Sequence, residues 1–227
     1  MTDLVVAIDG PAGSGKSTVS RSVASSLEWI MLDTGAMYRA ITWAVLRAGV
    51  NPEDSERVAE VARTADIQLD TRPDVSLVRV NGINVTQEIR SAEVTSAVSA
   101  VSAVPQVRER LVDLQRETVE RSDHGIVIEG RDIGTVVLPD ARLKIYLTAD
   151  PRVRAKRRGI QLGHIMSESE LDDMQQTIME RDSKDSSRDI SPLKAAPDAV
   201  IIDTSNLTQD EVVLEITALA QKTYNAS

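Results

Sequence analysis

The sequence predicts an α/β fold in which a five-stranded parallel sheet carries helices on both faces. Five short apolar runs alternate with helical patterns along the 227 residues, as they do in βαβ units. The first run leads directly into a glycine-rich segment and then a helical pattern, the strand–loop–helix order of a phosphate-binding P-loop. Hydrophobic residues make up 41% of the chain, enough for one sizeable core at this length. We therefore expect one P-loop NTPase-type core over residues 1–227.

Short apolar runs bounded by turn residues mark the expected strands. Their core must be aliphatic, because the chain has no Phe, only two Trp and three Tyr. The expected strands are 4–8, 29–32, 126–128, 143–147 and 199–202.

Helices are expected where apolar residues recur every three or four positions. Two of them begin with a capping box, Ser167-x-x-Glu170 and Thr208-x-x-Glu211, in which the two side chains each bind a backbone N–H. The expected helices are 15–27, 36–48, 52–65, 105–122, 151–162, 167–185 and 208–224.

The segment from Ile67 to Val85 breaks the alternation. Two short alternating runs, 78–80 and 83–85, flank Asn81-Gly82, and Asn-Gly in this position is the strongest short-range hairpin signal. An antiparallel hairpin does not belong to a parallel sheet. We therefore expect an inserted lobe with a small antiparallel sheet at 62–100.

A second irregular region, 159–166, joins two charged helical segments. The first of them contains five cations in seven residues, namely Arg152, Arg154, Lys156, Arg157 and Arg158. Such a run can be a solvated helix face. In a phosphate-binding protein with a net charge of −9, a functional interpretation is favoured. We expect a mobile lid over 152–168 whose arginines close over the phosphates.

Composition excludes several classes of function. A net charge of −9 and a pI of about 4.8 argue against DNA or RNA as a partner. The absence of cysteine excludes disulfides, thiolate metal sites and a cysteine nucleophile. His124 and His164 match no metal-ligand spacing. Because no targeting segment or 18-residue apolar run is recognised, we expect a soluble cytoplasmic protein without membrane contact.

The segment Gly10-Pro-Ala-Gly-Ser-Gly-Lys-Ser has the spacing G-x-x-x-x-G-K-[ST]. Glycines allow backbone N–H groups to surround phosphate oxygens, Lys16 adds a point charge, and the Ser17 hydroxyl is a ligand for Mg²⁺. The alternative is a glycine turn that only packs helix on strand. The expected ATP-binding residues are Gly10, Pro11, Ala12, Gly13, Ser14, Gly15, Lys16, Ser17 and Thr18.

Polar groups follow three of the expected strands: Asp9-Gly10, Asp33-Thr34-Gly35 and Glu129-Gly130-Arg131-Asp132. Ligands of open α/β sheets bind outside the carboxyl ends of the strands. Asp and Gly also occur in structural turns, so each segment alone is weak evidence for a ligand site. Two of the three bring an arginine, Arg131 and the nearby Arg39, and Tyr38 adjoins Arg39.

One face of the helix after the lid changes from apolar to charged residues along its length. Leu171, Met174 and Ile178 are spaced by three and four residues, and the same register continues through Arg181, Asp185 and Arg188. Burying these charges without partners would cost several kcal/mol each, so the face must meet polar or charged groups. The alternative is a structural ion-pair network. Beside a P-loop, phosphate oxygens for Arg and ribose hydroxyls for Asp are better partners.

Together these segments resemble the bacterial cytidylate kinase family from end to end. The resemblance is carried by the P-loop, by Leu-Asp-Thr-Gly-Ala-Met-Tyr-Arg (32–39), by Glu-Gly-Arg-Asp-Ile-Gly-Thr-Val-Val (129–137) and by Glu-Arg-Asp-x-x-Asp-x-x-Arg (180–188). It implies a monomeric kinase that uses ATP and Mg²⁺ to convert CMP or dCMP to the diphosphate. It also implies the inserted nucleotide-binding lobe and the short lid.

The resemblance also implies roles for individual residues. Arg39, Arg131 and Arg188 would bind the acceptor phosphate, Arg181 and Asp185 its sugar with Tyr38 nearby, and Ser99, Arg108 and Asp132 the cytosine. The chain departs from the family pattern at three positions. Thr34, one of the expected nucleotide-binding residues, stands where relatives often have Ser. Lys184 stands where they often have Arg, and Glu129 where they often have Asp. Arg154, Arg157 and Arg158 would be the lid cations, and Asp33 would contact Mg²⁺ indirectly.

Three other functions remain open from the sequence. Another small-molecule P-loop kinase could act on UMP, AMP or shikimate. A GTPase-like switch is disfavoured because the chain has no N-K-x-D or D-x-x-G motif for that role. A DNA-associated ATPase is disfavoured by the acidic charge balance.

Overall fold

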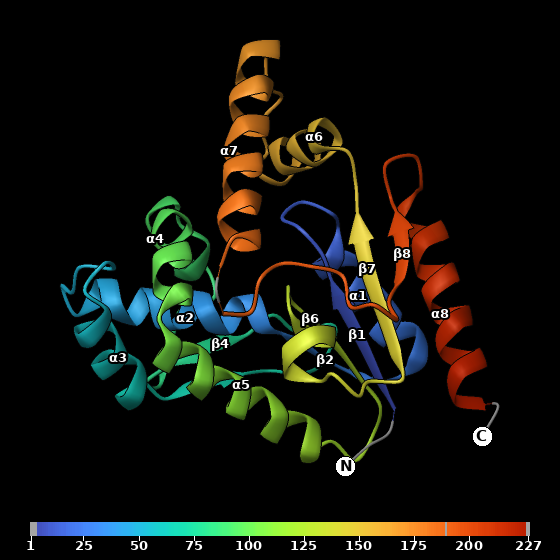
Figure 1. Cartoon of the computed structure of the whole chain (residues 1–227), viewed down its shortest axis with the longest axis horizontal. Helices are drawn as coiled ribbons and strands as arrows, with labels where there is room; N and C mark the ends of the chain where they lie inside the picture. The colour runs from blue at the N-terminus through green and yellow to red at the C-terminus, as the bar shows by residue number, and fades with distance from the viewer. Residues whose placement is uncertain (1–3, 189, 226–227) are drawn as a thin grey trace.

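Five parallel strands form the central sheet of the described part of the chain. The computed structural model describes residues 4–188 and 190–225, and positions 1–3, 189 and 226–227 of the expected core lie outside them. The sheet order is β2-β6-β1-β7-β8, which confirms the predicted parallel sheet and places the P-loop strand at its centre (Figure 1). Its strands are β1 (Val5–Asp9), β2 (Ile30–Asp33), β6 (Ile126–Glu129), β7 (Leu143–Thr148) and β8 (Val200–Asp203).

Helices cover both faces of this sheet, as predicted. Alternate residues of β1 point to opposite sides: Val6 and Ile8 pack with α1 and α8, whereas Val5 and Ala7 pack with α2 and α5. No helix in the described ranges is long and apolar enough to cross a bilayer. The predicted helices are observed as α1 (Lys16–Leu27), α2 (Thr34–Arg47), α3 (Ser55–Thr64), α5 (Pro105–Glu120), α6 (Pro151–Gln161), α7 (Glu168–Ser186) and α8 (Gln209–Asn225).

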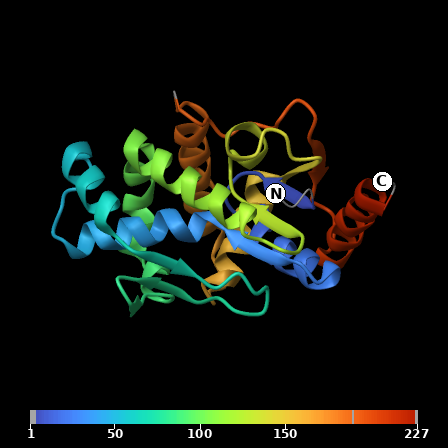
Figure 2. The same cartoon turned by 90° about the horizontal axis from the view of Figure 1, so that it is seen from below.

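A second, antiparallel sheet confirms the predicted hairpin. It consists of β3 (Ile67–Leu69), β4 (Val78–Val80) and β5 (Ile83–Asn84), in that order. The turn residues Asn81 and Gly82 have φ of 50° and 79°, as a two-residue hairpin with positive φ at both positions requires. Figure 2 shows this small sheet along α2, away from the five-stranded sheet.

Three elements were not expected. Helix α4 (Ala92–Ala103) begins at Ser91, whose side chain accepts from the N–H of Val94, and buries Val94, Val98 and Val101. The strand β6 is followed by a turn of π-helix, η2 (Ile133–Val137), and a short 3₁₀ turn, η1 (Glu88–Arg90), precedes α4.

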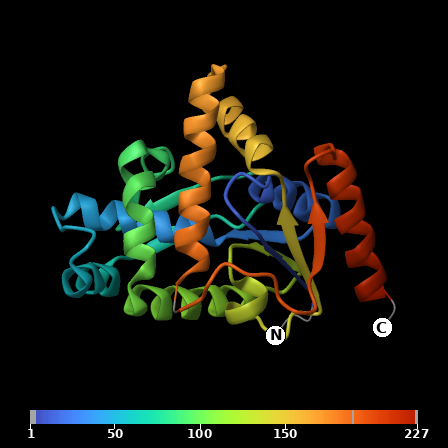
Figure 3. The same ribbon diagram turned by 45° about the horizontal axis from the view of Figure 1, so that its top comes forward.

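Helices α6 and α7 project beyond the rest of the molecule (Figure 3). A small cluster of Ala155, Leu171 and Ile178 holds them together. At their outer end Ile160, Leu162 and Ile165 are exposed, the last to 97%. That the segment 152–168 acts as a lid stays a prediction.

Candidate active site

The glycine loop joins the central strand β1 to α1 under tight steric limits. A Cβ on Gly10 would lie 2.0 Å from the carbonyl oxygen of Leu147, so no larger residue fits there. Gly13 and Gly15 have φ of 76° and 92°, the left-handed region that favours glycine. Because Gly15 is the N-cap, the first N–H groups of α1 lie beside the loop, where they suit an anion.

Lys16 folds back over this loop. Its Nζ donates to the carbonyl oxygen of Pro11 at 2.8 Å. Burial, followed by the nearby Arg131, lowers the pKa of Lys16 below its ordinary value. A bound phosphate would oppose that shift, because an anion stabilises the charged ammonium.

Oxygen groups gather next to Lys16. Glu129, at the end of β6, is 3% exposed, and its Oε1 has no hydrogen-bond partner in the described residues. Burial and the neighbouring Asp33 raise the pKa of Glu129, while Lys16 and the Ser17 hydroxyl lower it. Asp33 itself accepts from the N–H of Ala36 at 2.9 Å and caps α2.

Six arginines lie near one another, and one of them, Arg131, also lies near Lys16 of the loop. We call them the arginine cluster: Arg39, Arg108, Arg131, Arg158, Arg181 and Arg188. Burial, followed by Arg158, lowers the pKa of Arg39 to about 10. Burial, followed by Arg131, lowers the pKa of Arg181 to about 10. Burial also lowers the pKa of Arg188, to which Arg108 and Arg131 contribute. An acidic protein thus concentrates positive charge at one place, as anion binding requires.

Asp185 is the main counter-charge of the cluster. It is fully buried, lies 3.0 Å from the Nε of Arg131, and forms a second ion pair with Arg188. Arg188 also donates to the Ser102 hydroxyl at 3.2 Å. The structure therefore brings Asp185 of α7 and Arg188, which follows that helix, next to Arg131, which follows β6.

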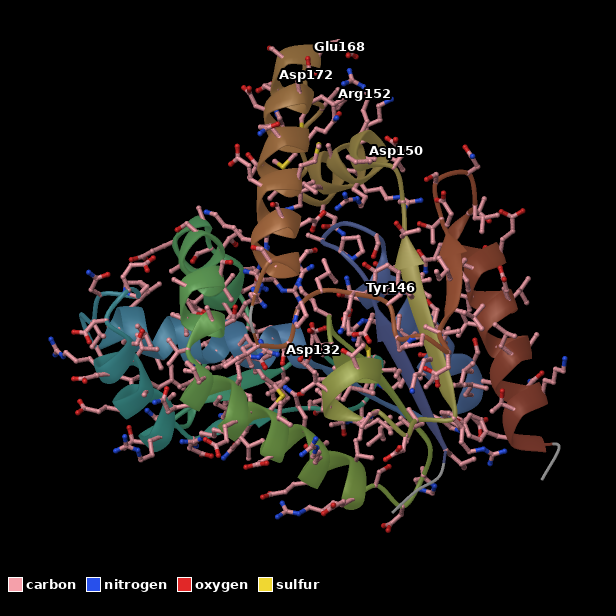
Figure 4. The ribbon with its side chains drawn as sticks, in the orientation of Figure 1. Asp132, Tyr146, Asp150, Arg152, Glu168 and Asp172 are labelled. Carbon is pink, nitrogen blue, oxygen red and sulfur yellow. The ribbon has the colours of Figure 1, made fainter. Side chains whose placement is uncertain are left out.

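Arg108, Asp132 and Tyr38 form a buried group below α7, where Figure 4 labels Asp132. The Arg108 guanidinium donates to Asp132 at 2.5 Å, and both side chains are at most 7% exposed. It also lies 5.2 Å from the centre of the Tyr38 ring. Burial raises the pKa of Tyr38 to about 12. A fixed donor next to a fixed carboxylate can read the edge of a base.

Three of the residues expected to bind the acceptor nucleotide make hydrogen bonds within the protein. The buried Thr34 hydroxyl donates to the carbonyl oxygen of Glu129 at 2.7 Å, which ties β2 to β6. Arg39 donates to the Ile89 carbonyl oxygen, at 3.0 Å. The carbonyl oxygen of Ser99 accepts from Ser102 at 3.1 Å. Their roles toward a nucleotide stay predictions.

The three cations of the predicted lid differ in their surroundings. Arg154 is 5% exposed and donates to the carbonyl oxygens of Ala149 and Ala12, both at 3.0 Å. Arg157 donates to the carbonyl oxygen of Thr204, after β8, at 2.6 Å. Arg158 belongs to the arginine cluster and contacts only the nearby Gln161 by a long hydrogen bond of 3.4 Å among the described side chains.

Three further polar residues contribute to the site: Asp9 was singled out only as part of Asp9-Gly10 at the sheet edge, and Ser102 and Asp182 were assigned no role from the sequence. Asp9 accepts from the N–H groups of Ile133 and Gly134, both at 2.8 Å, and so holds η2 and the adjoining Asp132. Burial raises the pKa of Asp9 to about 6. Ser102 stands out because it contacts two members of the arginine cluster. Asp182 accepts from the N–H of Ala12 in the glycine loop at 3.4 Å.

The chain matches the family model described as cytidylate kinase over residues 6–222. The chain belongs to the cytidylate kinase family. A cytidylate kinase from Mycolicibacterium paratuberculosis is 50% identical over 93% of this chain and 92% of the relative. One from Mycobacterium leprae is 49% identical over the whole chain and 99% of the relative. Among solved structures, a shikimate kinase from Acinetobacter baumannii is 14% identical, with a TM-score of 0.44 over 97% of this chain and 94% of that one.

Proposed function

We propose that the protein transfers the γ-phosphate of ATP to CMP or dCMP, which gives ADP and CDP or dCDP. Membership of the cytidylate kinase family supports this reaction. The observation that carries it in the structure is the arginine cluster beside the glycine loop, because two polyanionic nucleotides can meet only where their charge is neutralised. From the resemblance we also infer a cytoplasmic monomer, and gel filtration tests the oligomeric state.

The donor side of the proposed site is the glycine loop. Backbone N–H groups of the loop and of the first turn of α1 would bind the β- and γ-phosphates, with Lys16 as the fixed point charge. Arg158, which lies in the arginine cluster, would approach the transferring group, while Arg154 and Arg157 hold the base of the lid. Closure of the lid would exclude water as a competing acceptor.

The acceptor side of the proposed site is the arginine cluster. Arg39, Arg131 and Arg188 would bind the CMP phosphate. Arg181 and Asp185 would bind the sugar, and Arg108, Asp132 and Ser99 the cytosine, with the inserted lobe at 62–100 as their frame. One oxygen of the acceptor phosphate attacks the γ-phosphorus, and the bond to the β,γ-bridging oxygen breaks, so that ADP leaves with its electron pair. No general base is required, because the attacking oxygen is already anionic.

The residues next to the loop fit Mg²⁺. The buried Oε1 of Glu129 lacks a partner among the described residues, and the Ser17 hydroxyl lies beside this carboxylate. Mg²⁺ prefers oxygen ligands. It usually keeps several waters and binds substrate phosphate oxygens, with only one or two ligands from the protein. The described residues contain no group of three or more His, Cys, Asp or Glu that could hold a metal. Mg²⁺ would neutralise charge on the β- and γ-phosphates, with Ser17 as ligand and Glu129 and Asp33 oriented toward its waters.

Replacing Ser17 with Ala is expected to raise the Mg²⁺ concentration for half-maximal velocity about tenfold, because one oxygen ligand, worth about 1.4 kcal/mol, is lost. The measurement is a Mg²⁺ titration of the coupled kinase assay at fixed ATP. Ser26→Ala, an exposed serine on the same helix, is the matched control. An unchanged requirement in Ser17→Ala would contradict the assignment.

Replacing Asp132 with Asn is expected to lower the preference for CMP over UMP about tenfold, expressed as the ratio of kcat/KM values. The carboxylate accepts from the cytosine amine, whereas the amide of Asn can also donate to the uracil carbonyl. Loss of the buried ion pair also lowers activity on CMP itself. The exposed Asp140→Asn is the control, and an unchanged ratio would refute this role.

Acceptor choice is the direct test of the proposed function. Purified protein is assayed with CMP, dCMP, UMP, AMP and shikimate as acceptors under one set of conditions. CMP or dCMP should give the highest kcat/KM. Turnover of UMP, AMP or shikimate above both cytidine nucleotides would replace the proposal by another kinase, and GTP hydrolysis without an acceptor would indicate a switch.

A further inference from the structure

A closed ring of polar contacts joins the glycine loop to both lid helices. The Ala12 N–H donates to Asp182 Oδ1 at 3.4 Å, and the Ala12 carbonyl oxygen accepts from Arg154 Nη1 at 3.0 Å. The same Arg154 nitrogen pairs with Asp182 Oδ2. Both polar groups of one loop residue are thus bound by an ion pair between α6 and α7.

The surroundings of this ring are closely packed. Arg154 is almost completely buried, and its Nε donates to the carbonyl oxygen of Ala149 at the end of β7. A Cβ on Gly13 would lie 3.1 Å from both the Cβ and the carbonyl oxygen of Arg154. Helix α6 therefore packs directly on the loop, and a Cβ at Gly13 would force the two apart slightly.

Asp182 also faces the acceptor side of the site. Its Oδ1 lies 3.9 Å from Nη1 of Arg131, and that nitrogen has no hydrogen-bond partner in the described residues. One carboxylate thus lies between the donor loop and an arginine assigned above to the acceptor phosphate. The side chain of Asp182 is 17% exposed.

We propose that Asp182 is a positioning residue for phosphoryl transfer, which holds the glycine loop at Ala12, the base of the lid at Arg154 and the acceptor-side Arg131 in one fixed arrangement. This inference rests on the proposed function. In-line transfer requires the donor and acceptor phosphates at a set separation, and small misplacements of bound groups cost much rate. Because the ring fastens the base of α6 and α7 to the loop, lid motion is confined to their outer part.

The test compares two Asp→Asn variants on the same helix. Asp172 on α7 also pairs with an α6 arginine, accepting from Arg152 at 2.6 Å, but it is 66% exposed. Figure 4 shows Asp172, Glu168 and Arg152 around the outer end of α7, well away from Asp132. Asp172→Asn thus removes the same charge and the same type of ion pair without touching the loop.

Asp182→Asn is expected to lower kcat for CMP phosphorylation about tenfold or more, while KM for ATP changes less than about threefold. The charge lost is negative, so binding of the anionic nucleotides is not weakened. The expected fall in kcat comes from poorer alignment of the donor and acceptor phosphates. Hydrogen–deuterium exchange without nucleotide should show faster exchange for residues 10–15 in Asp182→Asn. Asp172→Asn should match the wild type in kcat, KM and exchange.

The inference is overturned if Asp182→Asn keeps wild-type kcat, if its kcat falls without faster exchange in the loop, or if Asp172→Asn shows the same losses. If Asp182→Asn does not fold, Asp182→Glu keeps the charge but displaces the carboxylate. It should show a smaller fall in kcat with faster loop exchange, and wild-type values of both would overturn the inference. A wild-type protein inactive on CMP and dCMP would instead refute the proposed function, since the exchange experiment uses no substrate.

Discussion

Replacing Lys16 with Ala is expected to lower kcat for CMP phosphorylation at least ~100-fold, which corresponds to about 2.7 kcal/mol of transition-state stabilisation. The ammonium is held beside the glycine loop by its bond to the Pro11 carbonyl oxygen. Under the proposed mechanism it is therefore already in place where charge develops on the transferring phosphate, and no other lysine belongs to the proposed site. Initial velocities at saturating ATP, CMP and Mg²⁺ measure the effect.

Two controls separate chemistry from folding in this experiment. Lys222→Ala removes an exposed lysine of α8 and should leave kcat unchanged. Thermal unfolding of Lys16→Ala shows whether losing the bond to Pro11 loosens the loop. Near-normal turnover in a folded Lys16→Ala protein would show that the loop does not hold the donor phosphates as proposed.

Replacing Arg188 with Ala is also expected to lower kcat at least ~100-fold. Arg188 links Asp185 to the Ser102 hydroxyl, and its side chain is only 13% exposed. The substitution removes one guanidinium of the proposed acceptor site and leaves Asp185 with Arg131 as its remaining ion-pair partner. Both effects disturb the alignment of the acceptor phosphate, which the same saturating assay reports.

Arg188→Lys distinguishes charge from geometry at this position. Lysine keeps the positive charge but lacks the planar fork that binds two phosphate oxygens. It should recover only part of the activity lost in Arg188→Ala. Arg121→Ala, an arginine whose side chain is 81% exposed at the end of α5, is the control. Full activity of Arg188→Ala would remove Arg188 from the site.

The fold could be predicted wherever local patterns decided the structure. The strands and the hairpin at Asn81-Gly82 follow from apolar runs and turn residues, which need no knowledge of distant contacts. Helix α4 was missed because Val and Ser weaken local helix propensity, although the Ser91 cap and the spacing of Val94, Val98 and Val101 marked it. The π-helical turn η2 depends on Asp9, more than 120 residues earlier, and has no local signal.

The candidate site could be predicted in part. Following the apolar face of α7 from Ile178 led to Arg181 and Asp185, which lie in or beside the arginine cluster. Asp182 was missed although it lies four residues after Ile178 and so on the same helix face. From the sequence, that face was continued only through Arg181, three residues after Ile178. The different surroundings of Arg154 and Arg158 could not be predicted, since both belong to one run of cations and only tertiary packing separates them.

The exposed apolar tip of the predicted lid, Ile160, Leu162 and Ile165, offers a site for a probe of lid motion. Since the chain contains no cysteine, Ile165→Cys would create its sole thiol, at a position whose side chain touches little else. A fluorophore attached there would report the tip alone. Its spectrum could follow each nucleotide as it arrives and leaves, without disturbing the fastened base of the helices.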